Sequence, residues 1–255
     1  MNEIKDPYVT CGSCLVKDWC GRRNGTSPLP ADYDSNPECN GFVMLEQAFK
    51  LSNIPEEYRN ANRNNFKFDD DNRHYQDYFT DTFNRIVELV DNGSNIAFIH
   101  PQKGTGKTHT VCTFAMEYIF KTCMNPDKFD FENPLALYVK YGTWANELRQ
   151  MYQLNDEDFN LKVLRTMNRM KKAPLLILDD IGSGRLTKFI KDLTYDIIDH
   201  RKENKLSTFM TTNIPLAQLE TDEYLGDIIT SRMLYNTFVY QLGGRDRRKE
   251  QTYFL

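Results

Sequence analysis

The segment FIHPQKGTGKTHT, residues 98–110, contains most of a phosphate-binding loop. Gly104 and Gly106 leave room for backbone N–H groups around phosphate oxygens, and a helix beginning near Lys107 would point its positive end at them. The Lys107 ammonium would contact the β- and γ-phosphates, and the Thr108 hydroxyl would ligate magnesium. We therefore expect ATP and Mg²⁺ at six successive residues, namely Gly104, Thr105, Gly106, Lys107, Thr108 and His109.

Pro101 departs from the loop pattern, which ordinarily opens with glycine. The first glycine serves chiefly in the turn out of a strand, and proline makes a turn with φ near about −65° although it donates no N–H. We expect a small geometric cost and intact nucleotide binding. Apolar IAFIH before the loop and THTVCTFAMEYIF after it supply the strand and helix that the motif requires.

Polar residues also end two other apolar segments, KAPLLILDD and STFMTTN. Asp179 would hold magnesium through water, and Asp180 would orient or deprotonate the attacking water, a role more often taken by Glu. The shorter reach of Asp180 predicts slow turnover. The amide of Asn213 would sense the γ-phosphate or hold the water; alternatively, it caps the segment that Pro215 opens.

Five short apolar runs alternate with helical patterns and would position these groups. We expect strands at 96–100, 135–141, 175–181, 207–212 and 237–242, and helices at 75–90, 107–122, 143–171, 187–203 and 215–235. This alternation predicts an α/β fold with a five-stranded, mostly parallel sheet flanked by helices. The carboxyl ends of its strands would form the ligand-binding edge.

Composition limits the function classes. The chain has 255 residues, 32 basic and 36 acidic, and its net charge of −4 means that any nucleic-acid contact must be local. No apolar run approaches ~18 residues, and the amino terminus lacks the apolar stretch of a signal peptide. We expect a cytoplasmic protein without membrane contact.

Four of the six cysteines cluster near the amino terminus, at Cys11, Cys14, Cys20 and Cys39. In a reducing compartment, clustered cysteines are first interpreted as metal ligands. Four thiolates in a turn-rich segment too small for an apolar core suit a structural Zn²⁺, which would supply folding energy. An iron–sulfur cluster is the alternative. Cys112 and Cys123, on the helix after the loop, are expected in the core.

Together these residues resemble the AAA+ ATPases of the bacterial replicative helicase loader family, the DnaC and DnaI type. The resemblance covers about residues 72–250 and is most specific from LLILDD through MTTN to SRM and GRDRR. It implies that Asp179 carries the magnesium and that the catalytic positions are Asp180, Asn213 (sensor 1) and Arg232. Arg232 would be an arginine finger for a neighbour's ATP. The Arg247-Arg248 pair would sense nucleotide, or is a solvated charge run.

The resemblance also implies partners. A loader of this kind is an ATPase that uses hydrolysis as a switch, self-associates, and binds a hexameric replicative DNA helicase and single-stranded DNA. Loaders of the DnaI type carry an amino-terminal zinc domain, although the cysteine spacing here is not a close match. Aromatic and basic groups after the second strand could stack on bases and neutralise phosphate, or pack strand against helix; they are Tyr138, Lys140, Tyr141 and Trp144.

We therefore expect a cysteine-rich metal-binding module at 1–45, a linker at 46–71 and an AAA+ ATPase domain at 72–255. The acidic run 69–71 in the linker is expected to be a solvated helix start. Two other interpretations stay open. A transposition helper of the IstB type shares the ATPase motifs but lacks the cysteine-rich segment. A small-molecule P-loop kinase would need a lid and an acceptor pocket, and it gives Asn213 and Arg232 no role.

Overall fold

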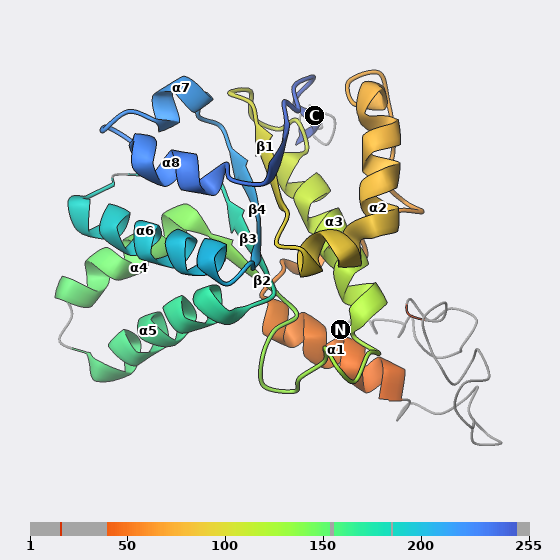
Figure 1. Cartoon of the computed structure of the whole chain (residues 1–255), viewed down its shortest axis with the longest axis horizontal. Helices are drawn as coiled ribbons and strands as arrows, with labels where there is room; N and C mark the ends of the chain where they lie inside the picture. Colours follow the sequence, from red (N-terminus) through yellow and green to blue (C-terminus); the bar gives the residue numbers. More distant parts are fainter. Residues whose placement is uncertain (1–15, 17–39, 154–155, 185, 249–255) are drawn as a thin grey trace, which may run out of the picture.

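The computed structural model describes Val16 and residues 40–153, 156–184 and 186–248. Its centre is a five-stranded sheet with helices packed on both faces (Figure 1). The predicted α/β fold class and the five-stranded sheet are confirmed. The four amino-terminal cysteines, with the module predicted for them, lie outside the described residues.

All strands of the sheet are parallel. They are β1 (Asn95–Ile99), β2 (Ala136–Lys140), β3 (Leu175–Asp179), β4 (Ser207–Thr212) and β5 (Thr237–Tyr240). Their order is β2-β3-β4-β1-β5, and the register places Lys140 beside Asp179 and Ile99 beside Thr212. The phosphate loop after β1, the acidic pair at the end of β3 and Asn213 after β4 therefore meet at one edge.

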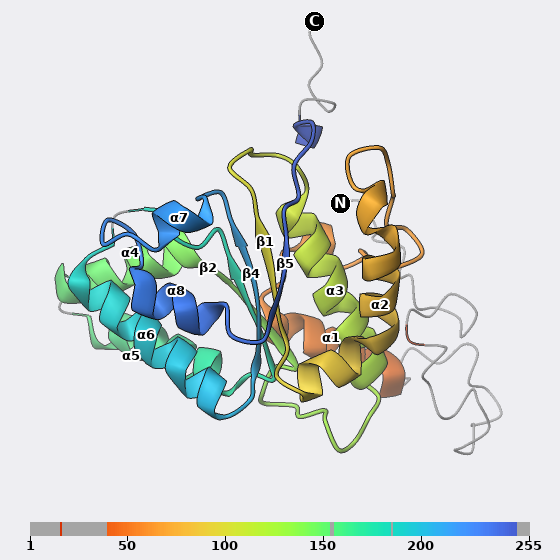
Figure 2. The same cartoon turned by 45° about the horizontal axis from the view of Figure 1, so that its top comes forward.

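Each face of the sheet has its own apolar core (Figure 2). One face carries α1 (Asn40–Ser52), α2 (Gln76–Asp91) and α3 (Lys107–Thr122), with single 3-10 turns at Glu56–Tyr58 and Arg73–Tyr75. The other carries α4 (Tyr141–Gln153), α5 (Glu157–Lys172), α6 (Lys188–Glu203), α7 (Leu216–Leu219) and α8 (Asp227–Met233). The helices thus enclose the sheet on both faces.

Two predicted helices are each divided in the structure. The pattern at 143–171 forms α4 and α5, because Asp156 starts a new helix by accepting a hydrogen bond from the Phe159 N–H at 3.0 Å. The pattern at 215–235 forms the short α7 and α8. Gly226, with φ 85°, separates them, and a left-handed residue of this kind interrupts helical hydrogen bonding. Apolar periodicity alone does not reveal either break.

The segment predicted as a linker packs on the core of the α/β domain. Phe49 and Ile54 are 3% and 1% exposed and belong to the same apolar cluster as α2 and α3. Arg63 forms an ion pair with the buried Glu117 of α3 at 3.1 Å. Residues 46–71 therefore cover one side of the core, and the division of the chain into domains stays a prediction.

In the part of the chain that the structure describes, no helix combines the length and apolar character needed to cross a lipid bilayer.

The α2 helix joins the core through an aromatic cluster around Phe79. This side chain is fully buried, and its ring centroid lies 5.2 Å from Tyr240, 5.3 Å from Phe114 and 6.0 Å from Phe98. Edge-to-face pairs of this kind add to the energy of apolar burial. The cluster connects α2 to β1, α3 and β5. Because the phosphate loop joins β1 to α3, the cluster also helps to fix the position of the loop.

We predict that Phe79→Ala lowers the free energy of unfolding by about 3–5 kcal/mol, because it leaves a cavity among these rings. Tyr78→Ala, on the same helix but 64% exposed, is the matched control and should change it by no more than about 0.5 kcal/mol. Urea unfolding of the two variants measures both values. Equal losses would show that the cluster is not the anchor of α2.

Candidate nucleotide-binding site

The phosphate loop joins β1 to α3 and holds two glycines in the left-handed region. Gly104 has φ 76°, and Gly106, directly before the first residue of α3, has φ 94°. Residues with side chains rarely adopt this conformation, so both positions favour glycine. Pro101 lies exposed in the turn, and strand, loop and helix follow one another as the motif requires. The N–H groups at the start of α3 face the loop and favour an anion there.

Lys107 is a buried cation that forms no ion pair among the described residues. It is 6% exposed, and its Nζ donates to the carbonyl oxygens of Gln102 at 2.7 Å and His100 at 3.0 Å. Burial lowers the pKa of Lys107 to about 8, although the charge of Asp180 opposes the shift. Carbonyl dipoles compensate a buried ammonium less well than an anion does, so the site fits a phosphate group.

Asp179 accepts hydrogen bonds from three hydroxyl groups. Its Oδ1 accepts from Thr108 at 2.8 Å and Thr211 at 2.7 Å, and its Oδ2 accepts from Tyr138 at 2.7 Å. Burial, together with the charge of Asp179, raises the pKa of Tyr138, which stays a hydroxyl donor. Sequence reasoning misses Thr211 and Tyr138 as partners of this carboxylate. The only available signal is strand register, which becomes visible once the sheet order is known.

Asp180 and Asn213 contact each other directly. Asp180 Oδ1 accepts a hydrogen bond from Asn213 Nδ2 at 2.7 Å, and its backbone N–H donates to Thr211 Oγ1 at 2.9 Å. Asp180 has φ 58°, a strained left-handed conformation that persists where surrounding bonds fix it and that is frequent at functional sites. The structure thus brings together the two residues predicted to handle the attacking water.

The Thr108 and Asp179 pair fits a magnesium ion. Hydroxyl and carboxylate oxygens are ligands that Mg²⁺ prefers, and the ion usually keeps several of its waters. Asp179 is 5% exposed and forms no ion pair within the described ranges, so a divalent cation would neutralise its buried charge. Magnesium held there would draw negative charge away from the β- and γ-phosphates.

Residues 243–248, here called the carboxyl-terminal strap, lie directly on the phosphate loop. The Arg247 N–H donates to the Gly104 carbonyl at 2.9 Å, and a β-carbon on Gly104 would lie 1.7 Å from Asp246 Oδ1. The side chain of Arg247 is 29% exposed, whereas that of Arg248 is 66% exposed. A solvated charge run therefore describes Arg248 but not Arg247, whose position beside the loop fits contact with a nucleotide.

Acidic residues before α2 hold the strap in place. Asp69 pairs with Arg247 at 2.7 Å and with Arg245 at 3.4 Å, and Asp71 accepts a hydrogen bond from the Arg245 N–H at 3.2 Å. Although burial opposes the shift, the bond to Arg247 lowers the pKa of Asp69. The prediction of a solvated helix start is therefore wrong for Asp69 and Asp71. It fits Asp70, whose side chain is 99% exposed.

His109 forms part of an aromatic wall beside the loop. Its ring stacks on Phe66 at 5.9 Å and meets the edge of Tyr58 at 6.1 Å. Burial, followed by the charge of Arg247, lowers the pKa of His109, so the imidazole is neutral at neutral pH. The predicted loop residue thus offers a flat, uncharged surface rather than a cation.

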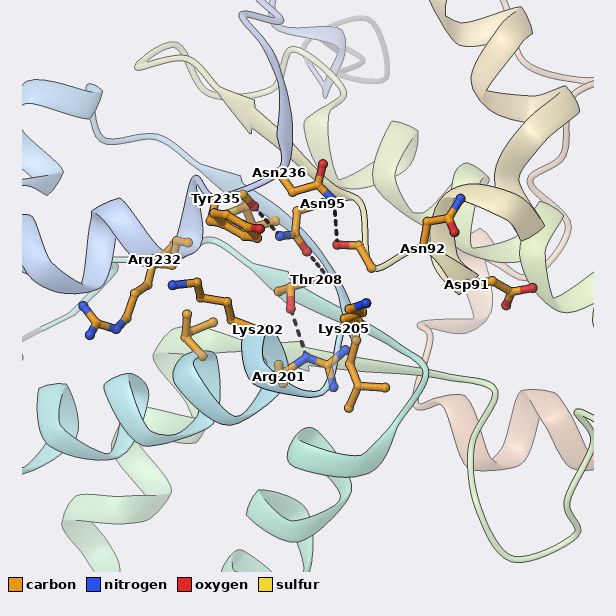
Figure 3. A pocket seen from close by; sticks show the side chains of 15 residues that line it. Asp91, Asn92, Asn95, Arg201, Lys202, Lys205, Thr208, Arg232, Tyr235 and Asn236 are labelled. Atoms are coloured by element: carbon orange, nitrogen blue, oxygen red, sulfur yellow. Dashed lines mark hydrogen bonds between the residues drawn. The ribbon is translucent and has the colours of Figure 1, made fainter.

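Arg232 lies at the opposite edge of the sheet from the loop of its own chain (Figure 3). It is near Asn95 and Asn236, at the amino-terminal ends of β1 and β5. Its Nε donates to Asp199 Oδ1 at 2.7 Å, and the guanidinium carbon lies 4.7 Å from the centre of the Tyr195 ring. The structure therefore separates Arg232 from the other predicted catalytic residues of the same chain.

The aromatic residues considered for base stacking belong to the core. Tyr141 and Trp144 are 0% and 2% exposed, and Tyr138 is occupied by Asp179. Of the two alternatives, core packing therefore holds for Tyr141 and Trp144, and the Tyr141 hydroxyl lies 2.9 Å from the Thr194 hydroxyl of α6. Lys140 is exposed at the end of β2.

Cys112 on α3 and Cys123, directly after the end of α3, are both buried, as predicted. No group of three or more His, Cys, Asp or Glu side chains in the described ranges could hold a metal ion. The predicted metal ligands lie outside these ranges, and they are Cys11, Cys14, Cys20 and Cys39. Zinc and the iron–sulfur alternative both stay predictions.

Comparison with known proteins finds similarity to an ATP-binding family and to replicative helicase loaders. Residues 134–253, just under half of the chain, match the model of a family described as IstB-like ATP binding protein. The replicative helicase loader DnaI of Bacillus subtilis (strain 168) is 25% identical over 162 residues. That match covers 59% of this chain and 47% of the relative, so it spans about half the length of the relative.

Solved structures of two helicase loaders share the fold. A crystal structure of DnaI, with 22% identity and a TM-score of 0.58, covers 79% of this chain and 100% of that chain. A crystal structure of the DnaC helicase loader, with 19% identity and a TM-score of 0.55, covers 74% of this chain and 100% of that chain. The chain is similar to the helicase loaders. At these identities the structural likeness concerns the fold.

We predict that ATP affinity falls as pH rises above about 8. The Lys107 ammonium, with a pKa of about 8, loses its proton in the free protein above that pH, whereas a bound phosphate favours the charged form. Binding then requires proton uptake and weakens by up to about tenfold per pH unit. His109 titrates below this window, since its pKa is lowered.

Titration of a fluorescent ATP analogue between about pH 7 and pH 9.5 measures this dependence. Lys107→Arg is the matched control, because a guanidinium stays protonated throughout that range. The ATP affinity of this variant should not vary with pH, even if it is lower than that of the wild type. A flat profile for the wild-type chain would contradict the assignment of Lys107 to the phosphates.

Proposed function

We propose that this chain is an ATP-dependent loader of a replicative DNA helicase. The observation that carries the proposal is the assembled site at one edge of the sheet. Buried Lys107 lies in the loop, Thr108 is bonded to Asp179, and Asp180 is bonded to Asn213. Similarity to DnaI supports helicase loading as the use of this ATPase, with hydrolysis as the switch.

The proposed hydrolysis relies on positioning. The Asp180 carboxylate and the Asn213 amide, 2.7 Å apart, would hold the attacking water in line with the γ-phosphate. Lys107 would stabilise the phosphate charge, and Arg247 would add a second cation. Because Asp is one methylene shorter than the usual Glu, we expect slow turnover.

Arg232 would act on the ATP of a neighbouring subunit. It lies at the amino-terminal edge of the sheet, so a full strand separates it from the loop of its own chain. Asp199 and Tyr195 fix the plane of its guanidinium from the side of α6. Because the guanidinium is already held in place, little conformational entropy is lost when it binds a phosphate. Arginine fingers increase the rate of hydrolysis ~10³- to 10⁵-fold. ATP hydrolysis would then require self-association.

We predict that Arg232→Ala and Lys107→Ala are each inactive alone and regain ATPase activity when mixed. The first variant keeps its nucleotide site and the second keeps its finger. Specific activity of the wild type should also rise with protein concentration. ATPase assays with helicase and single-stranded DNA present measure both. Activity per chain that does not vary with concentration, with no recovery in the mixture, would show that the finger does not act in trans.

The proposed partners are a hexameric helicase and single-stranded DNA. The helicase would bind the amino-terminal segment, whose four cysteines would hold one structural zinc; an iron–sulfur cluster is the alternative. The IstB-like family match favours a second candidate function, an ATPase that assists transposition. Such a helper would have no affinity for a replicative helicase, so the helicase interaction separates the two.

We predict that the full chain copurifies with a bacterial replicative helicase and that the double variant Cys11→Ser with Cys14→Ser does not. The variant should lose its metal, measured by elemental analysis, because tetrahedral zinc needs all four thiolates. It should still bind ATP, since the contacts described for Lys107 and Asp179 involve no residue of the cysteine-rich segment. A wild-type chain that binds ATP but no helicase would favour the transposition helper.

A further inference from the structure

A cavity of about 280 Å³ opens at the edge of the sheet opposite the phosphate loop (Figure 3). Three turns form its walls: 91–95 between α2 and β1, 201–206 between α6 and β4, and 232–236 between α8 and β5. These turns precede adjacent strands of a parallel sheet, so they meet at the same edge. The cavity is therefore a part of the fold and is separate from the nucleotide site.

The charge around the cavity is positive, although the chain as a whole is acidic. Lys202 and Lys205 line it, are exposed, and form no ion pair among the described residues. The one acidic side chain in the lining, Asp91, pairs with Lys128. Arg232 is held by Asp199 at 2.7 Å. Two lysine ammonium groups thus remain available to an anion.

A buried cation beneath the cavity adds to this potential. Arg201 is 1% exposed and also lines the cavity. Its guanidinium donates to Thr208 Oγ1 at 2.9 Å and to the carbonyl oxygens of Met170 at 2.6 Å and Ala173 at 2.8 Å. No carboxylate partners it within the described ranges. Burial lowers the pKa of Arg201 to about 9, so it stays charged at neutral pH, and its field is weakly screened.

Tyr235 supplies an exposed aromatic face at the mouth of the cavity. The residue is 59% exposed, and Lys202 Nζ lies 4.9 Å from the centre of its ring. Asn95 fixes the turn beneath the ring, because its Nδ2 donates to the Tyr235 carbonyl at 2.8 Å and its Oδ1 accepts from the Thr208 N–H at 2.7 Å. An aromatic ring beside cations is the arrangement that binds a base next to its phosphate.

We propose that this cavity binds single-stranded nucleic acid, with a backbone phosphate between Lys202 and Lys205 and a base stacked on Tyr235. The inference rests on the proposed function, which includes a nucleic-acid partner, and it places the contact at the edge of the sheet away from the nucleotide. A free phosphate would use the lysines but not the exposed ring. The ring therefore selects a strand that carries bases.

The test is fluorescence anisotropy of the full-length chain with a labelled oligothymidylate and with an abasic strand of equal length. Lys202→Ala with Lys205→Ala should weaken binding and reduce the slope of log K against log salt by ~0.7, the contribution of one phosphate contact on a single strand. Tyr235→Ala should weaken binding of the oligothymidylate about 5- to 150-fold, and Tyr235→Phe should retain it.

The matched control is Lys162→Ala with Lys188→Ala, which removes two exposed lysines elsewhere and should leave both slope and affinity close to wild type. Thermal unfolding of each variant excludes loss of fold. If the wild type binds and the cavity variants bind equally well, this inference is wrong while the proposed function stands. If the wild type binds no strand at all, the proposed nucleic-acid partner fails as well. Equal binding of the abasic strand would overturn the assignment to a base-bearing strand.

Discussion

The carboxylate of Asp179 is the group on which the rest of the nucleotide site depends. It ends β3 and accepts hydroxyl bonds from α3, β4 and β2, through Thr108, Thr211 and Tyr138. These bonds require the parallel register in which Lys140 lies beside Asp179. Because side chains alternate between the two faces of a sheet, a slip of one residue would turn the carboxylate away from all three donors. Strand register and phosphate chemistry are therefore fixed by the same contacts.

Two segments, one before α2 and one after β5, also hold the phosphate loop in place. Asp69, before α2, pairs with Arg247, after β5, and the Arg247 N–H bonds the loop at Gly104. The same early segment is fixed on α3, where the buried Glu117 pairs with Arg63 and Lys121. A nucleotide phosphate would compete with Asp69 for Arg247. A rearrangement at the loop would therefore alter the contacts of residues 46–71, which directly follow the amino-terminal segment in the sequence.

Local patterns predict which residues the structure brings together at the candidate nucleotide site. The loop, its flanking strand and helix, and the polar residues at the ends of β3 and β4 each carry their signal within a few residues, and the structure places them together. The partners of Asp179 are not predictable in this way, because Thr211 and Tyr138 reach it only through the order of the strands. The ion pair of Asp69 with Arg247 joins residues far apart in sequence and has no periodic signal at all.

Features that the nearby sequence leaves open have the same physical origin. A polar segment with scattered apolar residues, such as 46–71, is typical of a linker in sequence. In the structure, however, Phe49 and Ile54 are buried in a core formed with other helices. From sequence, Trp144 beside exposed Lys140 could stack on bases or pack strand against helix, and its burial in the core shows that it packs. In both cases tertiary contacts decide burial, and the sequence nearby does not encode them. The exposed Tyr235 and its lysines show the converse: they lie on different turns and meet only because three parallel strands begin at one edge.

The two edges of the parallel sheet, where its strands begin and where they end, therefore carry different groups of residues. The residues proposed for phosphate chemistry lie at the carboxyl ends of the strands, and Arg232 with the basic cavity lies at the amino ends. Strands of about five residues, at ~3.3 Å per residue, keep the two edges ~16 Å apart, farther than an arginine side chain reaches. A finger at the amino edge can thus serve only another copy. Since Arg232 lines the cavity, an anion bound there would lower the repulsion among its cations and hold Arg232 and the turn after α8 in a fixed position.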